Sequence, residues 1–521
     1  MIKKNSPLVL IILDGWGIAS PSKDNAISLA RKPYFDQLIK NYPTFVLQAA
    51  GEAIGLLWGE IGGSEVGHLN LGSGRVIYQP FSYITKSIWD KSFFSKPAFL
   101  KAIEHIRKYN SKLHLLGLIT NAPVHGYIEH LYALLKLAKK EKIEKVYIHG
   151  ILDGRDTPSN TGYNFISQLE EIIEREKIGK IATLVGRFYA MDRDNHWERI
   201  EKAYSNLTEG IGEKSTLKPS LFIQRSYQKR IFDEELPPVV FLEKSGLIED
   251  NDVVIFFNFR ADRARQLTEA FTIEDFKGFS RTRFLKNLFF VTFTNYGKNL
   301  PVEVVFPREK IKNTLAEILS RYNLTQFHIA ETEKYAHVTY FFNGGNEIPF
   351  SGEDDILIPS PRIISYKEQP EMSAFLITKR VKEEINKNKY HFILVNFANP
   401  DMVAHTGDIN AAIKAVEVVD KCQGEIINLA LSKKGVVIVT ADHGNAEELR
   451  NPRTGEIDKE HSVNHVPFII ITNELKFKKE RENILDLSLM KPVGILADVA
   501  PTILKILNIP QPMEMTGRVL I

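Results

Sequence analysis

One serine in a glycine-rich stretch could carry out covalent chemistry. Ser64 follows Gly62 and Gly63 and precedes Glu65. A serine hydroxyl is a weak nucleophile unless a base or a metal lowers its pKa, and no Ser-His-Asp spacing suggests itself here. Two divalent metal ions could activate the hydroxyl instead. A glycine-rich stretch of this kind usually forms a surface turn without a catalytic role. A catalytic interpretation therefore depends on whether the chain also contains metal ligands.

Carboxylates and imidazoles far apart in the sequence are candidate metal ligands. No cysteine is among them, and they are Asp14, Asp401, His405, Asp442, His443 and His461. Such donors suit manganese, zinc or iron, and hard oxygen ligands favour manganese or magnesium. Asp401 and His405 could share one face of a helix, whereas Asp442 and His443 would point in different directions and so bridge two metals. A lone Asp or His is more often a helix cap or a satisfied loop residue, but candidates at the ends of several strands favour a metal centre.

Five arginines could form an anion pocket, because guanidinium groups suit carboxylate and phosphate. They are Arg155, Arg187, Arg193, Arg260 and Arg263, with further donors in His125 and Lys334. Surface ion pairs are the alternative, since acids flank several of these arginines. Their positions after three separate strands favour a small, multiply charged anion. Basic arms that bind nucleic acid would be less interrupted by acids and would contain more aromatic residues.

Short apolar runs rich in Val, Ile and Phe must position these side chains. Amphipathic stretches separate the runs, a pattern typical of mostly parallel sheets buried on both faces. The expected strands are Leu8–Leu13, Leu113–Ile119, Lys145–Ile151, Ile181–Val185, Val253–Phe257, Phe289–Phe293, Phe327–Ala330, Phe392–Phe397, Val436–Thr440 and Val466–Ile471. The polar candidates follow these runs directly, and open α/β sheets bind ligands at the carboxyl ends of their strands. The sequence therefore predicts an α/β fold with its functional residues at that edge.

The order of the candidates predicts two α/β domains, one inserted in the other. The presumed metal ligands and Ser64 fall before residue 75 and after residue 400, and the arginines fall between about residues 120 and 265. We expect a metal-binding domain of residues 1–78 plus 308–521 and an inserted substrate-binding domain of residues 79–307. Proline-containing segments, Tyr78–Pro80 and Pro301–Pro307, would be the hinges.

Composition excludes several classes of protein. A chain of 521 residues is too long for one ordinary core. A net charge of +3 does not indicate nucleic acid or a membrane surface as a partner, and no segment has the roughly 18 apolar residues of a membrane helix. The single cysteine, Cys422, excludes an internal disulfide. We expect a cytoplasmic monomer that acts on a small molecule.

Ordered motifs cover nearly the whole chain and are specific in combination. They are Leu13–Gly17, Gly63–Asn70, Leu152–Thr157, Gly186–Asp194, Asn258–Arg263, Glu333–Val338, Asn399–His405, Thr440–Asn445, and His461 before Asn464. Together they resemble the cofactor-independent phosphoglycerate mutases, of the alkaline phosphatase superfamily. The resemblance implies a phosphatase-like metal domain with an inserted phosphotransferase domain.

The same resemblance implies roles for the candidate residues. One Mn²⁺ would be held by Asp401, His405 and His461, and a second by Asp14, Ser64, Asp442 and His443; cobalt, zinc and magnesium share such ligands. The residues implied to hold phosphoglycerate are His125, Arg155, Asp156, Arg187, Arg193, Arg260, Arg263 and Lys334, with Asp156 the acid/base for the glycerate hydroxyls. Ser64 would take the phosphoryl group of 3-phosphoglycerate and return it to the 2-hydroxyl without 2,3-bisphosphoglycerate, in a closed site that excludes water.

Some positions depart from the family pattern, and rival functions stay open. Thr120–His125 stands where Ser-Asp-Gly-Gly-Val-His is usual, Gly63 where Asn is usual, and His465 where Pro is usual. A phosphomonoesterase or phosphopentomutase of the same superfamily is one alternative, which the arginine-rich insertion and its Asp153–Asp156 motif disfavour. A catalytically silent phosphoglycerate-binding protein is another, which the presence of Ser64 and every expected ligand disfavours.

Overall fold

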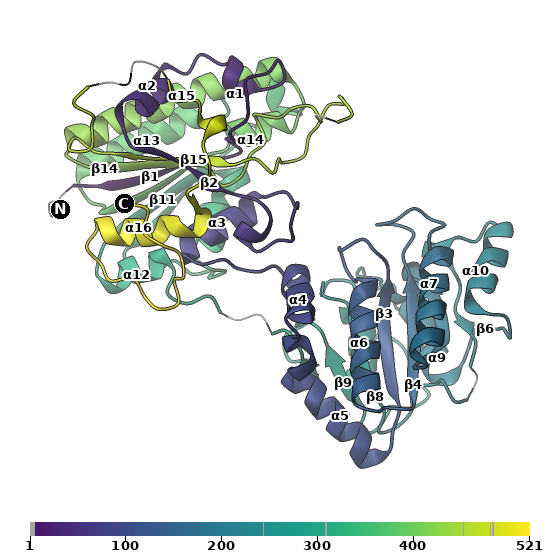
Figure 1. Ribbon diagram of the computed structural model, residues 1–521. Coiled ribbons are helices and arrows are strands. Elements are labelled where there is room, and N and C mark those ends of the chain that lie inside the picture. The colour runs from purple at the N-terminus through teal and green to yellow at the C-terminus, as the bar shows by residue number, and fades with distance from the viewer. Residues whose placement is uncertain (1–5, 243, 308–309, 452, 480, 482–483) are drawn as a thin grey trace. The chain divides into compact units, whose positions relative to one another are not determined.

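The chain folds into two compact α/β units. The computed structural model describes residues 6–242, 244–307, 310–451, 453–479, 481 and 484–521. The terminal unit comprises Met1–Gln79 and Lys310–Ile521, and the inserted unit comprises Pro80–Glu309 (Figure 1). Within these described ranges, each unit contains one eight-stranded sheet.

The terminal unit is a sheet covered by helices on both faces. Its strands, in spatial order, are β12 (Glu353–Ile358), β11 (Gln326–Glu331), β13 (Phe392–Phe397), β1 (Leu8–Leu13), β14 (Val436–Thr440), β15 (Val466–Ile471), β2 (Thr44–Gln48) and β16 (Gly494–Ile495). The run β11-β13-β1-β14 is parallel, and β15 is antiparallel to both β14 and β2. Every residue of β1 is buried, which is why its apolar pattern is continuous rather than alternating.

Helices cover the two faces of this sheet in separate groups. One face carries α2 (Pro33–Asn41), α13 (Ala374–Lys387) and α15 (Ile409–Ser432), and the other carries α3 (Ser64–Ser73), α12 (Leu315–Arg321) and α16 (Val499–Ile506) (Figure 1). Local chemistry sets where the helices begin: Pro33 opens α2, and the Asp408 side chain caps α15 by accepting a hydrogen bond from the Ala411 N–H.

The inserted unit repeats this layered plan. Its strands, in spatial order, are β10 (Glu303–Val304), β9 (Phe289–Thr292), β8 (Val253–Phe256), β3 (Leu113–Ile119), β4 (Val146–Leu152), β5 (Lys180–Gly186), β7 (Val239–Val240) and β6 (Glu213–Lys214). The run β8-β3-β4-β5 is parallel. One apolar cluster packs the sheet against α5 (Pro97–Tyr109), α6 (Ile128–Lys140) and α7 (Gly162–Glu176), and a second packs it against α9 (Trp197–Glu209) and α11 (Arg265–Thr272).

The predicted α/β class with mostly parallel sheets is confirmed, and each apolar run lies in a strand to within a residue at either end. The expected hinge Pro301–Pro307 is wrong in part. Glu303–Val304 forms the edge strand β10, and Val305 and Phe306 are buried in the inserted unit, because the apolar residues between the prolines can pack against β9. Of the described helices, none is long and apolar enough to span a membrane.

A chain of buried polar side chains crosses the sheet of the inserted unit. His114 and His149 are at most 1% exposed. The Nε2 atom of His114 lies 3.1 Å from Asp252 Oδ2, its Nδ1 lies 2.9 Å from His149 Nε2, and His149 Nδ1 lies 2.9 Å from the Thr183 hydroxyl. Burial lowers the pKa of His114 although Asp252 opposes it, and burial followed by the nearby His114 lowers the pKa of His149. Both imidazoles are therefore neutral in the folded unit, each with a partner on both ring nitrogens.

We expect this pair to make the inserted unit less stable in mild acid. In the unfolded chain both pKa values return to the ordinary 6.5, so the unfolded state binds more protons below that pH. Stabilisation is complete above the unfolded pKa, and the free energy of unfolding falls by up to about 1.4 kcal/mol per histidine for each pH unit below it. Denaturant titrations of the parent and of His149→Gln at about pH 5 and about pH 7.5 would measure this. The variant should lose less stability on acidification, whereas His105→Gln, on the half-buried face of α5, should match the parent. Equal losses in all three proteins would contradict the prediction.

Candidate active site

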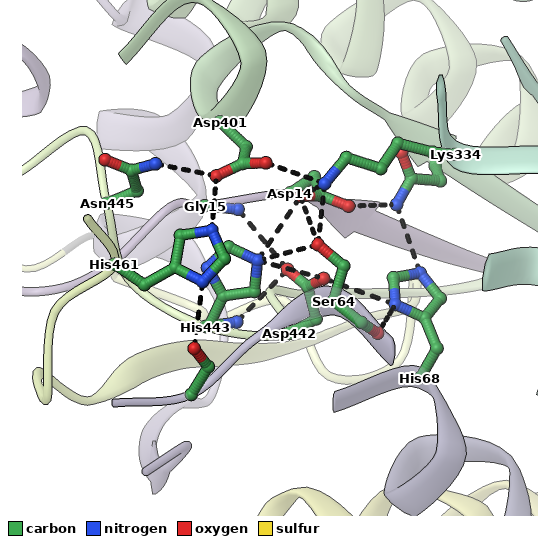
Figure 2. Close-up of polar contacts among 12 residues, drawn as sticks. Asp14, Gly15, Ser64, His68, Lys334, Asp401, Asp442, His443, Asn445 and His461 are labelled. Atoms are coloured by element: carbon green, nitrogen blue, oxygen red, sulfur yellow. Dashed lines mark hydrogen bonds and ion pairs between the residues drawn. The ribbon is translucent and has the colours of Figure 1, made fainter. Parts of the chain in front are cut away.

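The predicted metal ligands gather at one edge of the terminal unit's sheet. Asp14 follows β1, Asp401 follows β13, Asp442 follows β14 and Lys334 follows β11, and these four strands are adjacent and parallel. Their carboxyl ends therefore meet at the same edge. Because β15 is antiparallel, the segment before it, which carries His461, reaches that edge as well. Figure 2 shows Ser64 among these side chains.

Ser64 is the first residue of α3, and its hydroxyl has three polar neighbours. Its Oγ lies 2.8 Å from His443 Nε2 and 3.2 Å from Asp14 Oδ1, and it accepts a hydrogen bond of 2.6 Å from Lys334 Nζ. The residue is 7% exposed. The hydroxyl therefore lies beside a carboxylate that accepts its hydrogen bond and a cation that favours its deprotonated form.

Lys334 links the serine to two carboxylates. Its ammonium lies 2.6 Å from Asp401 Oδ2 and 2.7 Å from Asp14 Oδ1. Burial lowers the pKa of Lys334, but the charges of Asp14 and Asp401 outweigh that effect and raise it above its ordinary value. The lysine stays charged. The sequence grouped Lys334 with the arginines as a substrate ligand, and the structure adds that it contacts Ser64.

His405 and His461 direct one ring nitrogen each at Asp401. Their Nε2 atoms lie 3.3 Å and 3.2 Å from Asp401 Oδ1 and 3.1 Å from each other. Their Nδ1 atoms lie 2.6 Å from the Lys459 carbonyl and 2.9 Å from the Gly62 carbonyl. A carbonyl only accepts, so each Nδ1 carries a proton, and Nε2 is the nitrogen that faces the carboxylate and could bind a metal ion. Two imidazole nitrogens and a carboxylate oxygen that converge in this way lie close enough together to hold one metal ion.

The prediction that Asp442 and His443 point in different directions is wrong. His443 Nε2 lies 3.5 Å from Asp442 Oδ2 and 3.5 Å from Asp14 Oδ1, so both side chains turn into one site. The chain bends at these two residues after β14 ends at Thr440. Neighbours in a bent loop need not alternate as they do in a strand.

The charges in this site fit divalent metal ions. Asp14, Asp401 and Asp442 are at most 1% exposed and carry three negative charges, which the positive charge of Lys334 offsets only in part. Burial lowers the pKa of His443, but the carboxylates of Asp442 and Asp14 outweigh it and raise that pKa to about 10. Asp442 Oδ2 lies 3.2 Å from His68 Nδ1 and 3.5 Å from His443 Nε2. A buried excess of negative charge, with carboxylate oxygens and imidazole nitrogens that converge on it, suits a cation.

Groups of side chains close enough to share one ion include the predicted ligands and one further residue. These groups are Asp401 with His405 and His461, Asp14 with His68 and Asp442, and Asp14 with Asp401 and His443. The first matches the set implied for one manganese. The others overlap at Asp14, and they add His68, which the sequence analysis did not consider.

His68, Asn396 and Asn445 are contacts that the sequence analysis missed. Asn396 Nδ2 donates to Asp14 Oδ2 at 2.7 Å and lies 3.1 Å from His68 Nε2, while His68 Nδ1 lies 2.9 Å from the Ser64 carbonyl. Asn445 Nδ2 donates to Asp401 Oδ1 at 2.7 Å. Two signals were available: His68 is four residues after Ser64 on one helix, and Asn396 is a polar residue in the apolar run of β13.

The inserted unit brings a second set of charged residues to the carboxyl ends of its strands. Thr120, Asp153 and Arg187 follow the adjacent strands β3, β4 and β5. The buried Arg187 donates from Nη1 to Asp153 Oδ1 at 2.6 Å and to Asp156 Oδ2 at 2.5 Å, and Thr120 donates to Asp153 Oδ2 at 2.7 Å. Asp153 thus anchors Arg187, which in turn holds Asp156.

The other predicted anion ligands lie nearby, several of them paired with acids. Arg155 pairs with Glu234, and Asp262 pairs with both Arg193, at 3.1 Å, and Arg260, at 3.2 Å. Burial lowers the pKa of Arg263, and the positive charges of Arg193, Arg155 and Arg187 lower it further. Burial, followed by the charge of Arg187, lowers the pKa of His125 to about 4. These pKa shifts mean that the arginines lie close enough to repel one another. An anion pocket requires such a concentration of positive charge.

Comparisons with known proteins agree with this geometry. The chain matches the family model described as the metalloenzyme superfamily over residues 6–511. It is 47% identical to the 2,3-bisphosphoglycerate-independent phosphoglycerate mutase of Moorella thermoacetica, over 100% of this chain and 99% of that protein. It is 46% identical to 2,3-bisphosphoglycerate-independent phosphoglycerate mutase 1 of Methanosarcina barkeri, over 100% of this chain and 99% of that protein.

A solved structure agrees as well. The chain is similar to the phosphoglycerate mutase of Leishmania mexicana in crystals at low cobalt concentration, with a TM-score of 0.60 and 29% identity over 99% of this chain and 97% of that one. Identity of 46–47% over the full length of these relatives is enough to assign the chain to their family. The chain belongs to the family of 2,3-bisphosphoglycerate-independent phosphoglycerate mutases, within the metalloenzyme superfamily.

Proposed function

We propose that this protein interconverts 3-phosphoglycerate and 2-phosphoglycerate without 2,3-bisphosphoglycerate, and that Ser64 carries the phosphoryl group between the two positions. The observation that supports this most directly is the set of contacts at the Ser64 hydroxyl, with Lys334 Nζ at 2.6 Å and His443 Nε2 at 2.8 Å. A buried serine whose hydroxyl lies between the Lys334 ammonium and the Asp14 carboxylate is suited to attack phosphorus.

The place of Ser64 in the fold supports the same role. It begins the ten-residue helix α3, whose N-terminal backbone N–H groups and dipole favour an anion. A phosphoryl group on Oγ would gain from that end of the helix and from the charged Lys334. These interactions stabilise the phosphoserine and the charge that develops as it forms.

The proposed metal ligands are Asp401, His405 and His461 for one ion and Asp14, Ser64, Asp442 and His443 for the other. Bound divalent ions would lower the pKa of the serine hydroxyl and neutralise charge on the phosphoryl oxygens. We propose manganese, because hard oxygen donors, three carboxylates and the Ser64 hydroxyl, accompany three imidazoles and no thiolate, with cobalt, zinc and magnesium as alternatives.

The inserted unit supplies the proposed site for the glycerate part of the substrate. Arg155, Arg187, Arg193, Arg260 and Arg263, with His125, would bind its carboxylate and phosphate groups. Asp156, held at 2.5 Å by Arg187, would move protons to and from the glycerate hydroxyls. Glycerate must be retained and water excluded while phosphoserine exists, otherwise the enzyme becomes a phosphatase.

Ser64→Ala should abolish isomerisation and leave phosphoglycerate binding largely intact. The substitution removes the atom that takes the phosphoryl group, whereas the arginines stay in place. Coupled assays of 2-phosphoglycerate formation and calorimetric titration with 3-phosphoglycerate would measure the two effects. Near-normal turnover by the variant would overturn the proposed mechanism.

Metal removal should abolish isomerisation, and Mn²⁺ should restore it. The buried carboxylates lose the cations that offset their charge, so the hydroxyl loses its activation. The assay compares EDTA-treated protein with and without Mn²⁺, free of 2,3-bisphosphoglycerate, and records free phosphate in the same samples. Free phosphate as the main product would instead indicate a phosphomonoesterase, and neither product would favour a silent binding protein.

Asp156→Asn should lower kcat by about 10²–10⁴-fold, the usual contribution of a general acid or base. Asp194→Asn, which changes an exposed aspartate of the same unit beyond the neighbouring strand β5, is the control and should stay near the parent value. Steady-state kinetics in both directions would measure the change. A normal kcat for Asp156→Asn would remove this residue from the mechanism.

A further inference from the structure

The carboxylate of Glu447 lies buried beside the proposed metal centre without reaching a ligand position. Glu447 is 2% exposed. Its Oε2 accepts hydrogen bonds from the backbone N–H groups of Gly17, at 3.0 Å, and Asn445, at 2.8 Å. Its Oε1 accepts hydrogen bonds from the Ser462 hydroxyl and, at 3.0 Å, from Asn464 Nδ2. One side chain thus joins three separate segments of the terminal unit.

Each of these segments carries a proposed metal ligand. Gly17 is three residues after Asp14, Asn445 is two residues after His443, and Ser462 directly follows His461. Asn445 also donates to Asp401 Oδ1 at 2.7 Å. The ends of β1 and β14 and the segment before β15 are therefore connected through a single acceptor.

The surrounding backbone leaves room for this carboxylate and little else. A Cβ atom on Gly17 would lie 2.3 Å from Glu447 Cδ, and one on Gly444 would lie 2.4 Å from Glu447 Oε1. Both distances are far below van der Waals contact, so glycine is required at these two positions as long as the carboxylate is there. The four donors are neutral and all point at an acceptor-only group, which an amide of the same shape would not replace.

We propose that Glu447 is a positioning residue that fixes the ligand-bearing segments, His461 above all, for the metal ions. This inference rests on the proposed metal function of the site. Residues that hold ligands in place, without binding the ion, typically contribute 10–100-fold to metal affinity. In Glu447→Gln the amide Nε2 would either face the two backbone N–H donors at the Oε2 position, which cannot accept, or require the Ser462 hydroxyl and the Asn464 amide at the Oε1 position to turn over. Either outcome disturbs at least one of the ligand-bearing segments.

The test measures Co²⁺ binding rather than turnover. Metal-free parent and Glu447→Gln protein are titrated with Co²⁺ by calorimetry, the visible spectrum of the bound Co²⁺ is recorded, and the melting temperature of each metal-free protein is measured. We expect Glu447→Gln to bind Co²⁺ about 10–100-fold more weakly, with an altered spectrum.

Asp420→Asn is the matched control. Asp420 is a carboxylate in α15 of the same unit, 1% exposed, that accepts hydrogen bonds from the backbone N–H groups of Tyr34 and Phe35. Its loss should lower the melting temperature without changing Co²⁺ affinity or spectrum. A general loss of stability is thereby separated from a loss of ligand position.

A milder variant covers the case in which Glu447→Gln does not fold. Ser462→Ala removes one donor next to His461 and should weaken Co²⁺ binding in the same direction. Unchanged affinity and spectrum in the folded variants would overturn the proposal, as would a parent protein that binds no Co²⁺. Isomerisation is measured in a separate assay. A parent that binds Co²⁺ but fails to isomerise phosphoglycerate would therefore refute the proposed function and leave the role of Glu447 standing.

Discussion

Buried negative charge around Ser64 is the constraint on which the rest of the terminal unit depends. Asp14, Asp401 and Asp442 are almost fully buried, and each isolated carboxylate would cost several kcal/mol to desolvate. Lys334 and the raised pKa of His443 are responses to that charge. A fold that holds such a cluster must supply its stability elsewhere, and the continuous apolar strands and the helices on both faces do so.

In both units, parallel strands bring functional loops together at one edge of the sheet, but the two sites have opposite charge. Adjacent parallel strands deliver one loop each to a common edge, so side chains distant in sequence meet without long excursions of the backbone. In the terminal unit the loops carry carboxylates and imidazoles, which suit cations. In the inserted unit they carry arginines, partly balanced by Asp153, Asp156 and Asp262. Metal-assisted transfer of a phosphoryl group between positions of a small acid needs both kinds of site.

The features that the sequence predicted are those that can be recognised from continuous apolar runs and from the residues that follow them. It located the central strands, the proposed ligands and the arginines, because strand ends are readable from periodicity. It missed β12, in which Glu353 and Asp355 interrupt the apolar pattern, and it missed β2. It also missed Asn396, His68 and Glu447, whose roles depend on contacts between segments hundreds of residues apart. The directions of Asp442 and His443 depend on a bend that no propensity encodes.

Close backbone approach explains why these distant segments can act as one site. Gly15 has a φ of +71°, and a Cβ there would lie 2.8 Å from the Asp401 Cα; a Cβ on Gly67 would lie 2.7 Å from the Asp442 carbonyl oxygen. The ligand-bearing loops therefore pack backbone against backbone, with no flexible side chain between them to absorb a displacement. Catalytic geometry tolerates errors of only about 0.5 Å. Direct backbone contact transmits the rigidity of the sheet to the ligands, and it makes the shape of each loop depend on its neighbours rather than on its own sequence.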